Sequence, residues 1–465
     1  MQIFNTMTRQ KEELVPKVPG KISMYVCGPT VYNLFHIGNA RPFIVFDTLR
    51  RFLEYKGFEV TFVQNFTDID DKVIKKANEE NSTYREIADR YINEYYKDAD
   101  SLGIKRATAN PRATEHIDSI ISLVQLLIDN GHAYPTPDGD VYFSVRSFKD
   151  YGKLSGQSID DLESGARINP GEQKLDPLDF ALWKGSKPGE PAWQSPWGPG
   201  RPGWHIECSA MSMSILGETF DIHCGGQDLV FPHHENEIAQ SEAATGKPFA
   251  RYWMHNGFIN INNQKMSKSL NNFFLVRDIT NSYDPRAVRL FMLGAHYRNP
   301  VNFSDELMEQ AQSALTRLIT AKERIEDAKT NALPYTALND EEFIRSVKSY
   351  KEAFIAAMDD DLNTADALGV LFDFARASNV FVTERCGIDA VNKASSFFDE
   401  LSGVLGLDLG RKDTVYPKEA LMILAERTAA RMEKDFKRAD ELREKLKSMG
   451  FAVEDGKDGA RLKPL

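Results

Sequence analysis

Long hydrophobic runs are missing from this sequence of 465 residues, and cysteine is scarce. No stretch approaches the roughly 20 consecutive apolar residues that cross a bilayer, so we expect no membrane span. Four cysteines are too few for the disulfide framework of small secreted domains. Residues 1–13 lack the apolar core and the small-residue cleavage site of a secretory signal. We therefore expect a cytoplasmic protein whose reduced thiols are available for metal binding or packing.

Excess positive charge is missing as well. The formal net charge is −11, which argues against a general coat for polyanions, because non-specific binding to nucleic acid depends on neutralising phosphates. Residues 411–465 are an exception, with 14 Lys and Arg against 11 Asp and Glu. An RNA partner would need such a local basic face, although charge runs usually mark solvated helix surfaces.

The first 65 residues predict a βαβ unit. Residues 22–26 are typical of a strand, 37–55 of a helix and 59–65 of a second strand. This order predicts a parallel sheet of the Rossmann-like α/β class, whose ligands bind at the carboxyl ends of the strands. Because 465 residues exceed what one core usually supports, we expect about two to four structural units.

The middle of the chain predicts an insertion into this sheet. Residues 85–130 have a helical pattern, and a hairpin at 131–144 begins a smaller α+β region. Residues 165–203 are rich in glycine, proline and tryptophan, which is typical of an irregular surface segment. The sheet is expected to resume after this segment.

The last third of the chain predicts helices. Four helical patterns indicate a bundle, and they cover 305–329, 339–358, 363–383 and 391–405. Asn363 is a plausible N-cap for the third helix. A linker at 411–417 then precedes one amphipathic helix, 418–449, and a hairpin, 451–462.

Two short strings carry nucleotide chemistry. His36-Ile37-Gly38-Asn39 lies where the first strand passes into its helix, so its side chains and the helix N-terminal amides can face a phosphate. A capping role is the alternative, because His and Asn are common at helix starts. Lys265-Met266-Ser267-Lys268-Ser269 has two ammonium groups that can close over a transferring phosphoryl group, with a solvated loop as the alternative.

In this order, the two strings resemble the paired signatures of class I aminoacyl-tRNA synthetases. Other strings are similar, from end to end of the chain, to those of the cysteinyl-tRNA synthetase family: Cys27-Gly28-Pro29-Thr30, Phe66-Thr67-Asp68-Ile69-Asp70-Asp71-Lys72, Gly203-Trp204-His205-Ile206-Glu207-Cys208 and Phe231-Pro232-His233-His234-Glu235-Asn236-Glu237. One departure is Asn39, where the class signature most often has a second histidine. An amide can donate to phosphate or ribose oxygen but cannot become cationic, so we expect more from His36.

Thiols, imidazoles and carboxylates in these strings indicate a zinc site. His233 and Glu237 are four residues apart and would share a face on a helix. The spacing matches no compact zinc finger, and an isolated cysteine is more often a small buried hydrophobe. The residues by themselves leave His234, Glu235 and Cys224 as competing ligands.

The family resemblance implies Cys27, Cys208, His233 and Glu237 as ligands of one Zn²⁺, and a packing role for Cys224. A hydrophobic pocket separates near-isosteres such as cysteine and serine by only about 10². A thiolate binds zinc far better than an alcohol does, so the metal can select cysteine without an editing domain. The site must then accept a fifth ligand or release a weak one, for which Glu237 is the candidate.

The resemblance also implies a reaction and its partners. L-cysteine reacts with ATP, accompanied by Mg²⁺, to give cysteinyl-adenylate, and the cysteinyl group passes to the terminal ribose of tRNA(Cys). The implied catalytic residues are His36, Asn39, Lys265 and Lys268. The implied ATP-binding residues include these four and Gly38, Gly226 and Asp228. The implied substrate-binding residues are Gly28, Thr67, Trp204 and Asp228, with core packing as the alternative for Trp204.

The expected domains follow from the same resemblance. The catalytic domain occupies 1–130 and 201–260 around an inserted region at 131–200, and the lysine loop and stem-contact region follow at 261–304. A helical bundle of the anticodon-binding type then covers 305–410, and a small anticodon-recognition domain covers 411–465. We expect a monomer.

Two rival functions have features that disfavour them. The cysteine ligase of mycothiol synthesis shares the catalytic half but lacks a full anticodon-binding tail, so the long C-terminal region argues against it. A non-catalytic RNA- or zinc-binding regulator is disfavoured by the intact nucleotide strings.

Overall fold

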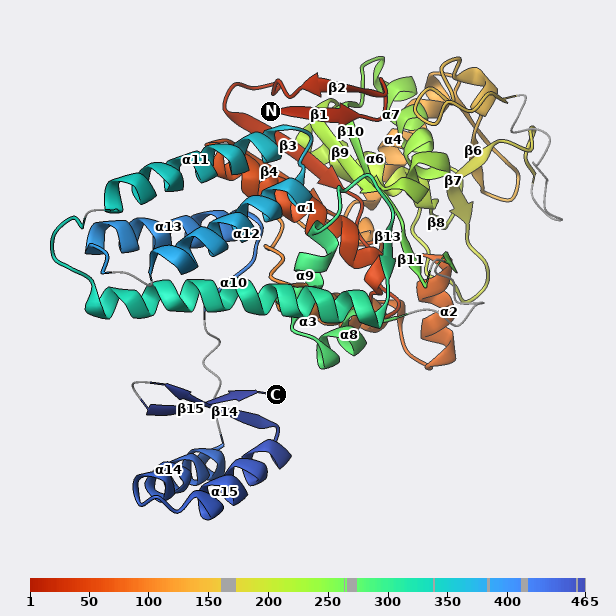
Figure 1. Ribbon diagram of the computed structural model, residues 1–465. Helices are drawn as coiled ribbons and strands as arrows, with labels where there is room; N and C mark the ends of the chain where they lie inside the picture. Colours follow the sequence, from red (N-terminus) through yellow and green to blue (C-terminus); the bar gives the residue numbers. More distant parts are fainter. Residues whose placement is uncertain are drawn as a thin grey trace. The chain divides into compact units, whose positions relative to one another are not determined.

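The computed structural model describes residues 1–159, 173–262, 264–265, 274–337, 339–382, 385–410, 417–456 and 459–464. They form two compact units, Met1–Leu409 and Gly410–Leu465, which are described separately (Figure 1). Within the described part of the chain, no helix is both long and apolar enough to cross a bilayer.

A four-stranded parallel sheet lies at the centre of the first unit, as the βαβ pattern predicts. Its order is β10-β9-β3-β4, with every neighbouring pair parallel. The strands are β3 (Lys21–Val26), β4 (Glu59–Gln64), β9 (Phe220–Gly226) and β10 (Ala250–Asn256). Helix α1 (Ile37–Tyr55) connects β3 to β4, and an N-terminal hairpin, β1 (Gln2–Asn5) and β2 (Gln10–Glu13), packs against β10. The Rossmann-like fold is therefore confirmed.

Helices follow β4, but not as one continuous stretch. The expected helical region at 85–130 is wrong in its middle, because residues 102–116 contain only a short 3-10 turn and run beside β4, where Ala109 bridges Val63. Backbone pairing with the sheet replaces helical hydrogen bonds there. The helices of this half are α2 (Asp71–Glu79), α3 (Tyr84–Ser101), α4 (Ile117–Asp129), α6 (Trp204–Leu216) and α7 (Glu235–Thr245).

The insertion is an antiparallel sheet with its own core. Its strands are β5 (Ala133–Pro135), β6 (Val141–Phe143), β7 (Phe180–Gly185) and β8 (Gly200–Pro202), paired in that order. The expectation of an irregular segment at 165–203 is wrong for β7 and β8, while 160–172 lies outside the described residues. Leu182 and Trp183 are both fully buried, so β7 lacks the alternating pattern that reveals a strand.

A small three-stranded sheet follows β10. It consists of β11 (Ile259–Ile261), β12 (Gln264–Lys265) and β13 (Val301–Phe303), in the order β12-β11-β13. Helices α8 (Val276–Ser282) and α9 (Pro285–Leu293) lie between β12 and β13 in sequence.

Four helices complete the first unit close to their expected limits: α10 (Asp305–Asn331), α11 (Asp340–Asp359), α12 (Thr364–Phe381) and α13 (Ile388–Val404). Asn363 is the N-cap of α12, accepting from the Asp366 amide at 3.2 Å. One continuous hydrophobic cluster extends from the parallel sheet into these helices. The bundle therefore shares a core with the sheet.

The second unit contains α14 (Lys418–Met432), α15 (Phe436–Ser448) and the hairpin β14 (Phe451–Gly456) and β15 (Gly459–Pro464). The expected single helix at 418–449 is wrong. Lys434 has a left-handed φ of 62°, and the Asp435 carboxylate accepts from the Arg438 amide at 3.1 Å to begin α15. The break lets the two helices pack against each other around a shared core.

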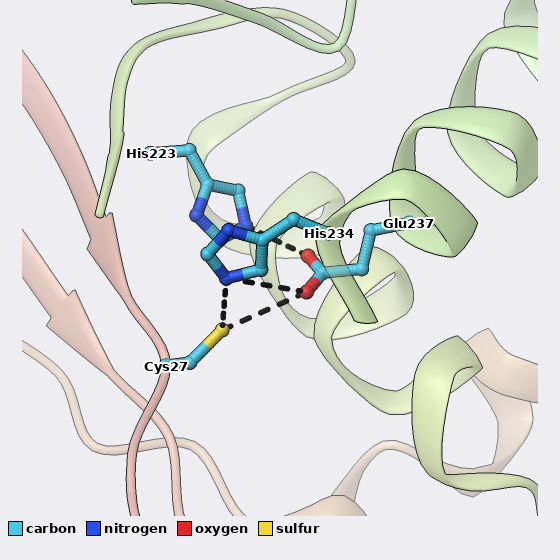
Figure 2. A group of neighbouring side chains, drawn as sticks. All are labelled: Cys27, His223, His234 and Glu237. Carbon is cyan, nitrogen blue, oxygen red and sulfur yellow. Dashed lines mark hydrogen bonds and ion pairs between the residues drawn. The ribbon is translucent and has the colours of Figure 1, made fainter. Parts of the chain in front are cut away.

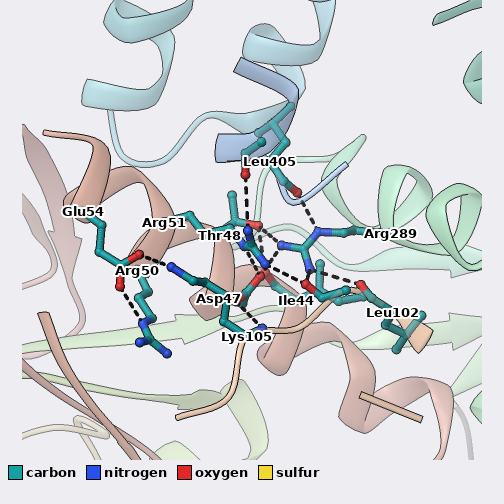
Figure 3. Close-up of polar contacts among 12 residues, drawn as sticks. Ile44, Asp47, Thr48, Arg50, Arg51, Glu54, Leu102, Lys105, Arg289 and Leu405 are labelled. Atoms are coloured by element: carbon teal, nitrogen blue, oxygen red, sulfur yellow. Dashed lines mark hydrogen bonds and ion pairs between the residues drawn. The ribbon is translucent and has the colours of Figure 1, made fainter. Parts of the chain in front are cut away.

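A buried ion cluster joins α1, α9 and the end of α13 (Figure 3). Arg289 is fully buried, and its guanidinium donates to the Asp47 carboxylate and, at 2.6 Å, to the Leu405 carbonyl. Burial would raise the pKa of Asp47, but Arg289 and Arg51 outweigh it and hold that pKa below its usual value. The cluster fastens the bundle to α1.

We expect Arg289→Met to lower the free energy of unfolding by about 3 kcal/mol, because it leaves Asp47 buried without its main partner. Urea titration followed by circular dichroism measures this change. Arg376 is the matched control, because its pair with Asp373 is exposed, with side-chain exposures of 80% and 52%. Arg376→Met should change stability by no more than about 0.5 kcal/mol, and equal losses in both variants would contradict the prediction.

Candidate active site

Four buried side chains meet above the carboxyl end of the parallel sheet. Cys27 directly follows β3, and Cys208 lies on α6. His233 lies in a short π-helical turn, Val230–His234, and Glu237 lies in the first turn of α7, which follows it. One ligand atom from each lies within 4.8 Å of all the others. Cys208 is in the second turn of α6. The sequence strings are therefore brought together by the sheet and two helices.

The contacts within this group are short. The Glu237 Oε1 atom is 2.9 Å from His233 Nε2 and 3.6 Å from Cys27 Sγ. The two sulfur atoms of Cys27 and Cys208 are 4.0 Å apart. The donor set of two thiols, an imidazole and a carboxylate could hold a metal ion.

A second group shares Cys27 and Glu237 but replaces the other two members with His223 and His234 (Figure 2). His223 Nε2 is 2.7 Å from Glu237 Oε2, and His234 Nε2 is 3.3 Å from Cys27 Sγ. The competition from His234 that the sequence left open is therefore present in the structure. His223, on β9, was not a candidate in the sequence.

The electrostatics of the first group favour the deprotonated form of two of its members, whereas burial raises the pKa of Cys27 well above its usual value, and Glu237, against the effect of burial, raises the pKa of His233 to about 10. The Cys27 thiol donates toward Cys208 and lowers the pKa of Cys208 to about 6 against the effect of burial. Burial would raise the pKa of Glu237, but His223 and His233 hold it well below its usual value. Metal binding requires deprotonated thiolate and carboxylate ligands, and these two groups are close to that state.

Trp204 covers the group from the solvent side. Its side chain is 42% exposed, so the alternative of core packing is wrong. The indole stacks on the His233 ring with centroids 4.4 Å apart and an interplanar angle of 24°. Trp204 is therefore a wall between this group and solvent.

His36 and Asn39 line one small cavity of about 160 Å³, together with Lys72. His36 is the N-cap residue of α1, but its side chain makes no capping bond to the helix. The capping alternative therefore does not account for His36. The Lys72 ammonium lies 5.6 Å from the Tyr32 ring in the same cavity and was not proposed from the sequence.

The lysine string is described only in part. The main chain of Lys265 belongs to β12 and pairs with Asn260 of β11. Lys268 lies outside the described residues.

The two glycines before Asp228 pack against neighbouring side chains. A Cβ atom on Gly225 would lie 2.7 Å from the His234 ring, and one on Gly226 would lie 2.4 Å from the Asp228 carboxylate. These side chains occupy the space that a Cβ atom would take. Asp228 is exposed and lines a cavity of about 600 Å³ with Gln227 and His255.

Comparison with known proteins decides the family. Residues 13–313 match the model of the class I (C) tRNA synthetase catalytic domain, 353–410 match the DALR domain, and 413–461 match the cysteinyl-tRNA ligase anticodon binding domain. The chain is 56% identical to the cysteine–tRNA ligase of Caldicellulosiruptor saccharolyticus over 464 residues, covering 99% of both chains. It is 55% identical to that of Clostridioides difficile, covering 100% of both. The chain belongs to the cysteine–tRNA ligase family.

The fold of this cysteine–tRNA ligase family member extends to other synthetases. Mycobacterium tuberculosis methionyl-tRNA synthetase in complex with methionyl-adenylate matches with a TM-score of 0.61 at 15% identity, covering 83% of this chain and 89% of that one. At this identity the match concerns the fold alone.

A buried carboxylate that the sequence did not indicate as a site residue lies beside Thr67. Glu207 is 1% exposed, and the Thr67 hydroxyl donates to it at 3.0 Å. Burial raises the pKa of Glu207 well above its usual value. Among the described residues, no cation lies within ion-pair distance of Glu207. Gly28, also expected to bind substrate, packs so tightly on Asn65 that a Cβ would lie 1.7 Å from its carbonyl oxygen.

Proposed function

We propose that this protein activates L-cysteine with ATP and transfers the cysteinyl group to tRNA(Cys). The observation that carries the proposal is the buried group of Cys27, Cys208, His233 and Glu237 above the sheet, because the chain leads from Cys27 directly to Pro29 and Thr30 in the wall of the cavity that His36 and Asn39 line. Soft thiolate ligands suit a metal that binds the thiol of an amino acid, and the start of a helix suits the phosphates of a nucleotide. The two features together suit the reaction of cysteine with ATP.

In the first step, a carboxylate oxygen of cysteine attacks the α-phosphorus of ATP, and the bond to the β-phosphate oxygen breaks to release pyrophosphate. His36, Asn39, Lys265 and Lys268 stabilise the charge on the phosphoryl group, with Mg²⁺ accompanying ATP. In the second step, a hydroxyl of the terminal tRNA ribose attacks the carbonyl carbon, and AMP leaves with the bonding electrons. Catalysis is then mainly positioning and electrostatics.

We assign Zn²⁺ to the group that contains Cys208 rather than to the one that contains His223 and His234. In the first group, two proposed ligands are supported by histidines that would not touch the metal. His205 Nδ1 lies 2.9 Å from His233 Nδ1, and His223 lies against Glu237. In the second group, His223 would bind through Nε2, and its buried Nδ1 has no hydrogen-bond partner. Ligating histidines almost always bond through their other nitrogen, which favours the first group.

When bound, Zn²⁺ would offer a position that the thiolate of cysteine takes far better than the hydroxyl of serine does. Trp204 limits the space beside the site to a small side chain. With His233 Nε2 on the metal, Glu237 keeps the contact of its Oε2 atom with His223 Nε2 at 2.7 Å, so it is less suited to leave than the sequence indicates.

Thr67 and Glu207 suit the amino group of cysteine. Since the Thr67 hydroxyl gives its only hydrogen to Glu207, its oxygen can accept from an ammonium, whose charge would favour the ionised form of Glu207 against the effect of burial. Asp228 suits the nucleoside instead, because it lines the larger cavity, in which Thr67 takes no part.

We expect Glu207→Gln to raise the KM for cysteine about tenfold with little change in kcat, because a charged hydrogen bond contributes about 1.5 kcal/mol or more. Steady-state pyrophosphate exchange measures both constants. The control is a second ligand, 3-mercaptopropionate, which lacks the amino group. Its inhibition constant should be the same for wild type and Glu207→Gln. An equal loss for both compounds would contradict the assignment.

The second unit and the bundle are proposed to hold tRNA(Cys), in a cytoplasmic monomer. The match of 413–461 to an anticodon-binding domain supports this and disfavours the mycothiol ligase. Cysteine-dependent exchange of pyrophosphate into ATP, followed by charging of tRNA(Cys), tests the whole proposal. An absence of exchange by zinc-replete protein would reject it.

A further inference from the structure

Arg41 is a buried cation without an acidic partner. It lies on α1, two residues after Asn39, and is 0% exposed. Within the described residues, no carboxylate lies within ion-pair distance of its guanidinium. Burial lowers the pKa of Arg41 only to about 10, so the side chain remains charged at neutral pH. A buried charge of this kind must be compensated by other polar groups.

Backbone carbonyls of two separate loops compensate this charge. The guanidinium donates at 2.8 Å to the carbonyls of Gly257 and Phe258. It also donates to three carbonyls of the second loop, those of His296 at 3.4 Å, Tyr297 at 3.2 Å and Asn299. A rigid planar fork is the side chain that can span so many acceptors.

Each of these loops leads directly into a strand of the small sheet. Residues 257–258 precede β11, and residues 296–299 precede β13. Strand β11 pairs with β12, the strand that contains Lys265. The loops are also packed tightly on each other, since a Cβ on Gly257 would lie 2.6 Å from the Arg298 carbonyl oxygen. Arg41 thus holds the base of the sheet that carries Lys265.

The start of α1 has a second link to this region. His36 forms an antiparallel bridge with Leu275, and the Ile37 amide donates to the Phe274 carbonyl at 3.0 Å. Segments on both sides of the lysine string, residues 257–258 before it and 274–275 after it, are therefore bonded to the start of α1.

We propose that Arg41 is a positioning residue for adenylate formation: it holds the β11–β12–β13 sheet, and with it the backbone of Lys265, at a set position relative to His36. This inference rests on the proposed function, in which groups from both elements stabilise the same phosphoryl transfer. A displacement of about 1 Å between such groups can cost about 10²-fold in rate. Arg41 touches no reacting atom in this proposal, and the zinc ligands do not depend on it.

The test compares Arg41→Lys and Gly257→Ala with wild type in cysteine-dependent pyrophosphate exchange, with rates normalised to titrated active sites. Lysine keeps the charge but cannot span two loops, and the added methyl group forces the same loops apart from the other side. We expect kcat to fall about 10²-fold in both variants. We expect the KM for cysteine and the zinc content to stay within twofold of wild type.

Arg289→Met is the matched control, because Arg289 is also a buried arginine bonded to carbonyls but lies in the bundle contact. It should lose stability and keep its kcat per active site. An unchanged kcat in Arg41→Lys, or a parallel rise in the KM for cysteine, would overturn the proposal. Failure of both Arg41→Lys and Gly257→Ala to fold would assign a structural role and overturn it as well. A wild type without exchange would reject the proposed function itself.

Discussion

Cys208→Ser is expected to abolish zinc binding and to reduce cysteine-dependent pyrophosphate exchange by more than about 10²-fold. Loss of an outer partner of a metal ligand already costs about 10- to 100-fold in metal affinity, and Cys208 is proposed as a ligand itself. Its thiol is 2% exposed and lies 4.0 Å from the sulfur of Cys27. Serine fits the same space but supplies an alcohol, which is a poor ligand for zinc. Zinc per chain is measured by atomic absorption and activity by exchange.

Cys224 is the matched control. It is a fully buried thiol on β9, outside both groups of candidate ligands. Cys224→Ser should therefore keep its zinc and its KM for cysteine. A third variant separates the two groups, because His234→Gln should keep zinc if Cys208 is a ligand. Zinc retained in Cys208→Ser but lost in His234→Gln would move the metal to the group with His223 and His234.

His36→Ala is expected to lower kcat for pyrophosphate exchange by about 10² to 10³, the usual effect of removing one group that stabilises transition-state charge. The KM for cysteine should change little, because the zinc group binds the thiol elsewhere. Asn39→His should be tolerated, because a second imidazole at this position can donate to the same oxygen atoms.

His116 is the control for His36, because it also occupies the N-cap position of a helix, α4, without making a capping bond. His116→Ala should keep kcat. If both alanine variants lost activity equally, the effect would belong to helix starts in general. If His36→Ala instead raised the KM for cysteine at constant kcat, His36 would bind the amino acid rather than the phosphate.

Local patterns in the sequence predicted most of the fold. The apolar run before Cys27, the helix that begins at Ile37 and the four helices of the bundle all follow from periodicity. Three expectations failed where neighbouring segments decide the structure. β7 has no alternation because both of its faces are covered, the segment around Ala109 pairs with β4, and the helix expected to 449 breaks at Lys434 so that its halves can pack together.

The candidate site, like the fold, could be predicted from the sequence only in part. The residue types, together with the family resemblance, named the donor set of Cys27, Cys208, His233 and Glu237, and the structure brings these four together. Nothing in the local sequence indicates that His223 lies against Glu237 or that Thr67 donates to Glu207. These contacts join residues on different strands and helices, and only the packing of those elements creates them.

The sequence by itself determined the chemistry that this protein can perform: thiols and imidazoles that suit zinc, and two strings that suit a phosphate. The tertiary structure decided which of those groups meet. It kept His234 as a competitor by burying it beside Cys27, placed Trp204 over His233, and enclosed Arg41 between two loops more than 200 residues away. The physical reason is that side-chain chemistry belongs to each residue, whereas distance and burial depend on how distant segments of the chain pack.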